Sequence, residues 1–152
     1  PSEDQVWIGF RESNFNPKSA SVILRRIERE LGANSLDLEQ MVAVKIAPGK
    51  PSELQEMTGV TDCAGLANKD GRISNYALIP KSAKKEFEQC MFATKRLRML
   101  VRTGLPTQTL LNTNAVSPAL LEERRDVLQG HAKRIWNWTA LAEVAPPLLA
   151  YS

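Results

Sequence analysis

The sequence predicts a mainly α-helical protein, a single-domain bundle of about five or six helices with a minor two-stranded element. Three long segments with helix start or stop signals carry this prediction, at residues 16–32, 82–104 and 117–144. The length of 152 residues suits one domain with its own hydrophobic core. We expect that domain to span residues 1–152, with residues 1–15 and 145–152 as candidate peripheral arms.

The first long helix is predicted to begin at Asn16-Pro17 and to be closed by Gly32. Asn is a favoured N-cap, Pro suits the first helical position, and Gly commonly ends a helix. Apolar residues recur three and four positions apart, as in a helix that buries one stripe: Ala20, Ile23, Leu24, Ile27 and Leu31. We interpret three basic residues outside this stripe as a solvated face: Arg25, Arg26 and Arg29.

Shorter elements are expected between the long helices. Asn34-Ser35 begins a segment, LDLEQMVAVKIA, that we interpret as helix, although its VAVKI portion also fits a strand. SELQEM, at residues 52–57, predicts a short helix, and residues 107–112 predict another. The β-branched and aromatic runs VWIGF (residues 6–10) and RISNYALI (residues 72–79) are the candidates for the minor extended pair.

Residues 82–104, SAKKEFEQCMFATKRLRMLVRTG, form the longest stretch that reads as one uninterrupted helix. Ser82 is the expected N-cap, and Gly104 followed by Pro106 is the expected stop. A broad apolar side of this helix predicts that it forms the centre of the core: Phe87, Cys90, Met91, Ala93, Thr94, Leu97, Leu100 and Val101.

The same helix is expected to concentrate positive charge. Between residues 81 and 104, seven basic residues stand against two acidic ones, a local charge of +5 where the whole chain has +3. On one continuous helix, Lys84, Lys95 and Arg102 would share a line, Lys85 and Arg96 a second, and Phe92 and Met99 would lie between them. Two interpretations stay open: basic side chains around a second packing layer, or a face that neutralises phosphates.

Residues 96–104, RLRMLVRTG, resemble a basic RNA-contacting helical stretch of influenza-type viral nucleoproteins. The run from Asn34-Ser35-Leu36 through Met41 is faintly similar to another piece of those proteins. The resemblance covers a small part of the chain, which is far shorter than members of that family. It implies RNA binding and a viral nucleoprotein-like role, and no fold or assigned residue is transferred from it.

Ser117-Pro118 is a strong start signal for the last helix, which we expect to continue to about residue 144. Arg124 and His131 fall within its apolar side, and we interpret His131 as a half-buried structural residue. Trp136 points away from Trp138. It suits either stacking on a nucleobase or filling a helix–helix seam, and both alternatives stay open.

Catalytic and metal-binding motifs are not found in the sequence. Two cysteines, Cys63 and Cys90, with one histidine make no zinc constellation, and the turn at residues 68–71 lacks the later ligands of a calcium loop. We therefore expect a non-enzymatic protein without a cofactor or metal. The start is polar and no stretch is apolar enough to span a membrane, so an intracellular location, cytoplasmic or nuclear, is expected.

The functional hypothesis is a non-enzymatic nucleic-acid-binding protein, RNA foremost, with a packaging role. Six cations are predicted to hold the phosphate backbone: Lys84, Lys85, Lys95, Arg96, Arg98 and Arg102. Phe92 or Trp136 would supply stacking. The alternative is a structural or assembly module, such as a matrix- or capsid-like subunit or a helical adaptor. In this alternative, the C-terminal tail and Trp136 would mediate contacts between the subunits of a homo-oligomer. The basic face would bind acidic lipid or a protein partner.

Overall fold

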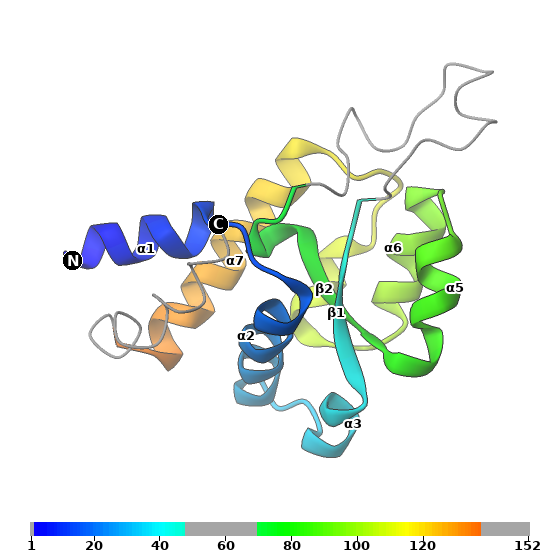
Figure 1. The fold of residues 1–152 in the computed structure, drawn as a ribbon, viewed down its shortest axis with the longest axis horizontal. Coiled ribbons are helices and arrows are strands. Elements are labelled where there is room, and N and C mark those ends of the chain that lie inside the picture. The colour runs from blue at the N-terminus through cyan, green and yellow to red at the C-terminus, as the bar shows by residue number, and fades with distance from the viewer. Residues whose placement is uncertain (1, 48–69, 138–152) are drawn as a thin grey trace.

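The computed structural model describes residues 2–47 and 70–137, which are mainly α-helical around one two-stranded antiparallel sheet (Figure 1). This confirms the expected fold class. The elements in chain order are α1 (Glu3–Glu12), α2 (Pro17–Glu30), α3 (Ser35–Glu39), β1 (Met41–Lys45), β2 (Tyr76–Pro80), α5 (Lys84–Gln89), α6 (Ala93–Val101) and α7 (Pro118–Ile135). Three short 3₁₀ helices accompany them, at Ile73–Asn75, Lys81–Ala83 and Pro106–Leu111.

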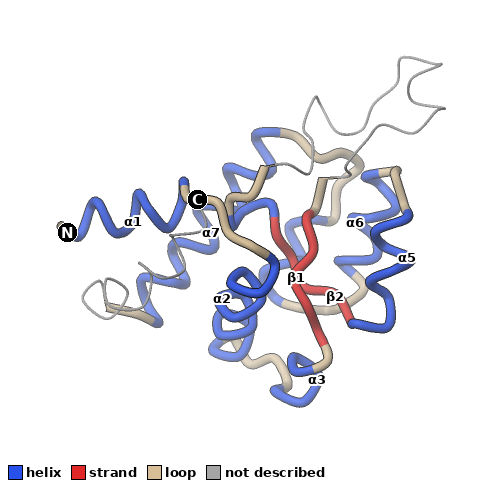
Figure 2. Tube along the Cα trace, in the orientation of Figure 1, coloured by secondary structure: helices blue, strands red, loops and turns tan. Residues whose placement is uncertain are grey.

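The sheet lies at the centre of the core. β1 and β2 pair in antiparallel register with Ala43 opposite Leu78, and they run between α2 on one side and α5 and α6 on the other (Figure 2). Successive side chains of a strand point to opposite faces. Ala43 and Leu78 therefore pack with α1, α2 and the end of α7, whereas Val44 and Ala77 pack with α5, α6 and the start of α7. The strands, rather than the helix expected at residues 82–104, form the centre of the core.

The first predicted strand, VWIGF, is instead part of α1. Ser2 accepts a hydrogen bond from the Gln5 backbone N–H at 3.2 Å, and the Gln5 side chain accepts from the Ser2 N–H at 2.9 Å. This capping box favours a helix start, and the helix then buries Val6, Trp7 and Phe10 on one side. These three residues belong to the core, so this part of residues 1–15 is packed rather than peripheral.

The segment expected to be one helix after Asn34 divides into a helix and a strand. Asn34 caps α3 as predicted, since its side chain accepts from the backbone N–H groups of Leu36 and Asp37. The helix then ends at Glu39, and Met41–Lys45 pairs with β2. That strand overlaps only the second half of the extended segment predicted at residues 72–79, because Ile73–Asn75 form a 3₁₀ helix instead. The prediction of a helix over VAVKI is wrong. These residues form a strand because β2, distant in sequence, supplies partners for their backbone hydrogen bonds.

The cap signals of the two longest helices are confirmed. The Asn16 side chain accepts from the Ser19 N–H at 2.8 Å, and Gly32 follows α2 with a φ of 98°. The Ser117 side chain accepts from the Leu120 N–H at 3.1 Å at the start of α7. That helix ends at Ile135, earlier than expected. The predicted helix at residues 52–57, Cys63, Trp138 and the candidate arm at residues 145–152 lie outside the described residues.

Side chains occupy the outer edges of both strands. Along β1, Arg25 donates to the Met41 carbonyl at 3.0 Å, and the Ser21 hydroxyl accepts from the Ala43 N–H at 2.8 Å. Along β2, Gln108 bonds both backbone groups of Leu78, and Arg124 donates to the Tyr76 carbonyl at 2.8 Å. These hydrogen bonds satisfy backbone groups that a third strand would otherwise pair.

Candidate nucleic-acid interface

The stretch expected to be one long helix is two helices. α5 ends at Gln89, α6 begins at Ala93, and Cys90 and Phe92 have extended backbone conformations between them. Ser82 lies in the 3₁₀ helix Lys81–Ala83 and caps neither α-helix. The predicted core side is only partly correct. Four of its residues are buried, Phe87, Ala93, Leu97 and Leu100, and four are half-buried, Cys90, Met91, Thr94 and Val101.

Arg96 explains the break between α5 and α6. Its guanidinium is 3% exposed and donates to the carbonyls of Phe87 and Cys90 at 3.0 and 2.9 Å. In a continuous helix those carbonyls would accept from residues four positions later. The same guanidinium reaches the end of β1, where it donates to the carbonyls of Lys45, Ile46 and Ala47.

The position of Arg96 corrects its expected role. Its guanidinium lies 4.1 Å from the centre of the Phe87 ring and its donors are taken by backbone carbonyls. A buried guanidinium with these partners is not accessible to a phosphate. Arg96 therefore connects α5, α6 and β1, and it is no longer a candidate for binding nucleic acid.

Three other predicted cations share the outer side of α6. Lys95, Arg98 and Arg102 are exposed and follow one another at intervals of three and four residues, which places them on one helix face. None of the three makes an ion pair within the described part of the chain. We call this set the α6 stripe.

The two lysines of α5 are not aligned with the α6 stripe. Both are exposed, but Lys84 Nζ lies 3.8 Å from Glu88 Oε1 one turn along the same helix. The expected lines, Lys84 with Lys95 and Arg102, and Lys85 with Arg96, assumed a continuous helix. Because the chain breaks between α5 and α6, the helical spacing no longer aligns them.

A hollow lies beside the start of α6. Its volume is about 430 Å³, and it is lined by Glu86, Gln89, Cys90, Met91, Phe92 and Lys95. Phe92 is 40% exposed, whereas the other three phenylalanines, Phe10, Phe15 and Phe87, are buried. Lys95 belongs both to this lining and to the α6 stripe. We call the feature the Phe92 hollow.

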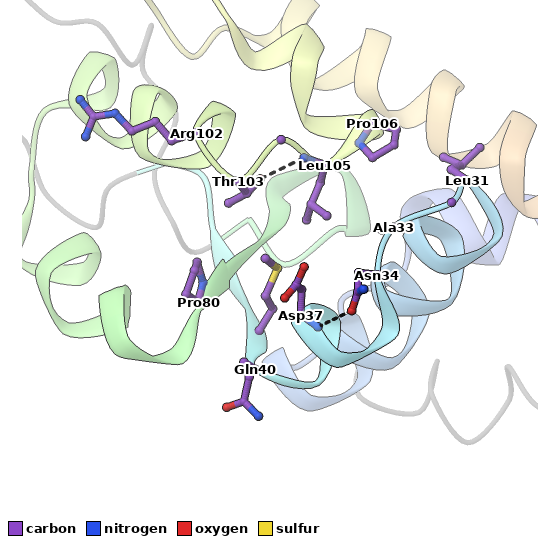
Figure 3. Close-up of a pocket in the computed structure, with 13 residues that line it drawn as sticks. Leu31, Ala33, Asn34, Asp37, Gln40, Pro80, Arg102, Thr103, Leu105 and Pro106 are labelled. Carbon is purple, nitrogen blue, oxygen red and sulfur yellow. Dashed lines mark hydrogen bonds between the residues drawn. The ribbon is translucent and has the colours of Figure 1, made fainter.

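A larger groove lies at the other end of α6, with a volume of about 640 Å³. Segment 31–34, α3 and β1 form one side, and residues 102–106 form the other (Figure 3). Leu31, Met41 and Leu105 supply apolar lining. Arg102 is at its edge and points away from its centre, so the groove itself is not a cationic site.

Gly104 ends α6 as predicted, with a φ of 72°.

Trp136 does not join the α6 stripe. It is half-buried just after α7 and packs against the core on the α1 and α2 side of the sheet, with the Arg26 guanidinium 5.9 Å from its ring centre. α6 lies on the opposite side of the sheet, as Figure 1 shows. Of the two aromatic residues predicted to stack on bases, only Phe92 lies next to the cations.

A buried polar network lies in the interior. Glu28 is 1% exposed, accepts a hydrogen bond from the Thr107 hydroxyl, and has no partner for Oε2 among the described residues. Burial raises the pKa of Glu28, although Thr107 and Arg124 oppose this shift. Arg124 is fully buried, and burial lowers its pKa to about 10.

The sequence does indicate a buried polar group here, because Arg124 falls within the apolar side of the last helix. It does not indicate the partners of Arg124, because they are distant in sequence. His131 is half-buried as expected, with its pKa lowered by burial and by Arg134.

Residues 2–47 and 70–137 contain no group of three or more His, Cys, Asp or Glu placed to hold a metal ion. Over the same ranges, no helix combines the length and the apolar character needed to cross a membrane. Comparisons with protein-family models, with curated proteins and with solved structures each find no match.

Proposed function

We propose that this protein binds nucleic acid, RNA foremost, through the α6 stripe and does not catalyse a reaction. The observation that supports this most directly is the accessibility of the stripe. Lys95, Arg98 and Arg102 are exposed, share one helix face and have no acidic partner in the described ranges. Unpaired cations in a row suit a polyanion, because each can replace a counterion at a phosphate.

The surrounding surface strengthens this proposal. The packing of Arg96 into the interior removes one cation from the surface, yet five exposed basic residues remain between residues 84 and 102. The exposed ring of Phe92 adjoins Lys95 in one hollow. Cationic side chains next to an exposed aromatic ring are typical of proteins that bind single strands without sequence preference.

Charge reversal tests the proposal. The variant Lys95→Glu/Arg102→Glu should bind a short RNA at least about tenfold more weakly at low salt, with a smaller dependence of affinity on salt. Lys18→Glu/Arg134→Glu is the matched control, since it makes the same charge change at exposed positions on α2 and α7. Fluorescence anisotropy at two salt concentrations gives both readings, and equal affinity of both variants and the wild type would refute the proposal.

Acidic lipid is the competing ligand, as in the alternative of a matrix-like assembly module. The same cations would attract a negative membrane surface. Co-sedimentation with phosphatidylserine vesicles, in the presence and absence of RNA, separates the two functions. Binding to vesicles with no measurable RNA affinity would favour the assembly function.

A further inference from the structure

We infer that the Phe92 hollow binds one unpaired nucleobase, so that the ligand of the α6 stripe is a single strand rather than a duplex. The inference rests on the proposed function and specifies its ligand. It depends on the aromatic and polar lining of the hollow and on the continuity of this hollow with the stripe.

The lining of the hollow suits the face of a base. Phe92 presents 40% of its surface to solvent next to Met91, and the volume of about 430 Å³ exceeds that of one aromatic ring system. Every nucleobase has a flat π-face, and stacking on an exposed aromatic ring therefore requires no particular sequence. In a duplex these faces are covered by the neighbouring base pairs, which excludes the same contact.

The polar part of the lining suits the edge of a base. Glu86 and Gln89 are three residues apart on α5, so they lie on one side of that helix. The carboxylate of Glu86 accepts hydrogen bonds, and the amide of Gln89 both donates and accepts them. The donors and acceptors on the pairing edge of a base are available to such groups only when the base is unpaired.

Lys95 connects the hollow to the stripe. It lines the hollow and is the first of the three cations along α6. A phosphate held at Lys95 would place the attached nucleotide beside Phe92, while Arg98 and Arg102 continue along the strand. Charge complementarity with the backbone thus identifies the occupant of the hollow as a base of the same strand.

The test compares strands and duplexes with Phe92 variants. A 12-nucleotide RNA, its duplex and the same backbone with abasic sites are titrated against wild type, Phe92→Ala, Phe92→Trp and Val22→Ala. Val22 is the matched control because it is an exposed apolar residue on α2, away from the hollow. Circular dichroism confirms that each variant is folded.

We expect the wild type to bind the single strand about tenfold more tightly than the duplex. Phe92→Ala should weaken binding of the single strand about tenfold and leave the duplex and the abasic strand unchanged, whereas Phe92→Trp should retain it. Val22→Ala should match the wild type.

Two results overturn the inference and leave the proposed function standing. One is equal affinity for strand and duplex. The other is unchanged binding by Phe92→Ala while Lys95→Glu/Arg102→Glu loses binding. No binding of any nucleic acid by the wild type overturns both.

Discussion

The side-chain amide of Gln108 completes the outer edge of β2 at Leu78. The Leu78 N–H donates to Gln108 Oε1 at 2.7 Å, and Gln108 Nε2 donates back to the Leu78 carbonyl at 3.1 Å. A neighbouring strand would make the same pair of bonds. Gln108 Nε2 also lies 2.9 Å from the Leu100 carbonyl and from Thr103 Oγ1, so one amide joins the sheet to the end of α6.

Replacing Gln108 should therefore destabilise the protein. Gln108→Leu keeps a similar volume but leaves both backbone groups of Leu78 buried and unpaired, and we expect the free energy of unfolding to fall by about 3 kcal/mol. Urea denaturation measures this change. Thr109→Ala, at the exposed neighbouring position, should shift it by less than about 0.5 kcal/mol. A similar loss of stability in both variants would contradict the conclusion that Gln108 completes the outer edge of β2.

Arg96 and Arg98 should respond differently to the same substitution. Arg96→Met leaves the carbonyls between α5, α6 and β1 without donors, and we expect a loss of about 3 kcal/mol in the free energy of unfolding. Arg98→Met should cost less than about 0.5 kcal/mol because its side chain is exposed. Chemical denaturation of both variants checks the contrast, and a stable Arg96→Met would show that the buried guanidinium is dispensable.

The raised pKa of Glu28 predicts a specific pH dependence. Its ordinary pKa is 4.5, and burial raises the pKa in the folded protein above this value. Between the two pKa values the folded state binds more protons than the unfolded state, so the contribution of Glu28 to stability falls as pH rises. One such group changes the free energy of unfolding by at most about 1.4 kcal/mol per pH unit.

Glu28→Gln imitates the protonated acid and should remove the loss of stability that Glu28 causes as pH rises. Relative to the wild type, the variant should become progressively more stable as pH increases from 4.5 through the folded-state pKa. Denaturation curves of both proteins from acid to neutral pH give the difference. A constant difference would mean that folding does not shift the pKa of Glu28, and a difference that shrinks with pH would mean that Arg124 stabilises its charged form; either result contradicts the prediction.

Arg98 offers a finer test of phosphate contact. Arg98→Ala should lower the magnitude of the slope of log affinity against log salt by about 0.7, the value for one phosphate of a single strand. Lys18→Ala, an exposed cation on α2, should leave the slope unchanged. Equal slopes for all three proteins would mean that Arg98 makes no phosphate contact.

Local sequence signals were sufficient for the parts of the fold that depend on neighbouring residues. The caps at Asn16 and Ser117, and the ends at Gly32 and Gly104, follow from side chains and backbone conformations within a few positions. The α1 helix has such a signal too, the capping box of Ser2 and Gln5, whereas the β-branched and aromatic run after it favours a strand by propensity alone.

Contacts between distant segments decided the rest. Nothing near Cys90 resembles a helix stop, and the break depends on Arg96 reaching carbonyls of β1 about fifty residues earlier. The candidate site shows the same limit. Arg96 and Arg98 carry the same charge, yet Arg96 is buried and Arg98 is exposed. Once α6 is known to begin at Ala93, its spacing separates them, because Arg96 lies three positions after Ala93 and four before Leu100 on the buried face.

The side chains that cover the sheet edges have a consequence for synthesis of the chain. β1 and β2 are complete by residue 80, but Arg96, Gln108 and Arg124, which bond their outer carbonyls and N–H groups, are translated later. A nascent chain that ends before α7 would leave the Tyr76 carbonyl at the outer edge of β2 without its Arg124 donor, and unpaired strand edges promote aggregation. The outer edge of β2 is therefore fully hydrogen-bonded only after Arg124 has emerged from the ribosome.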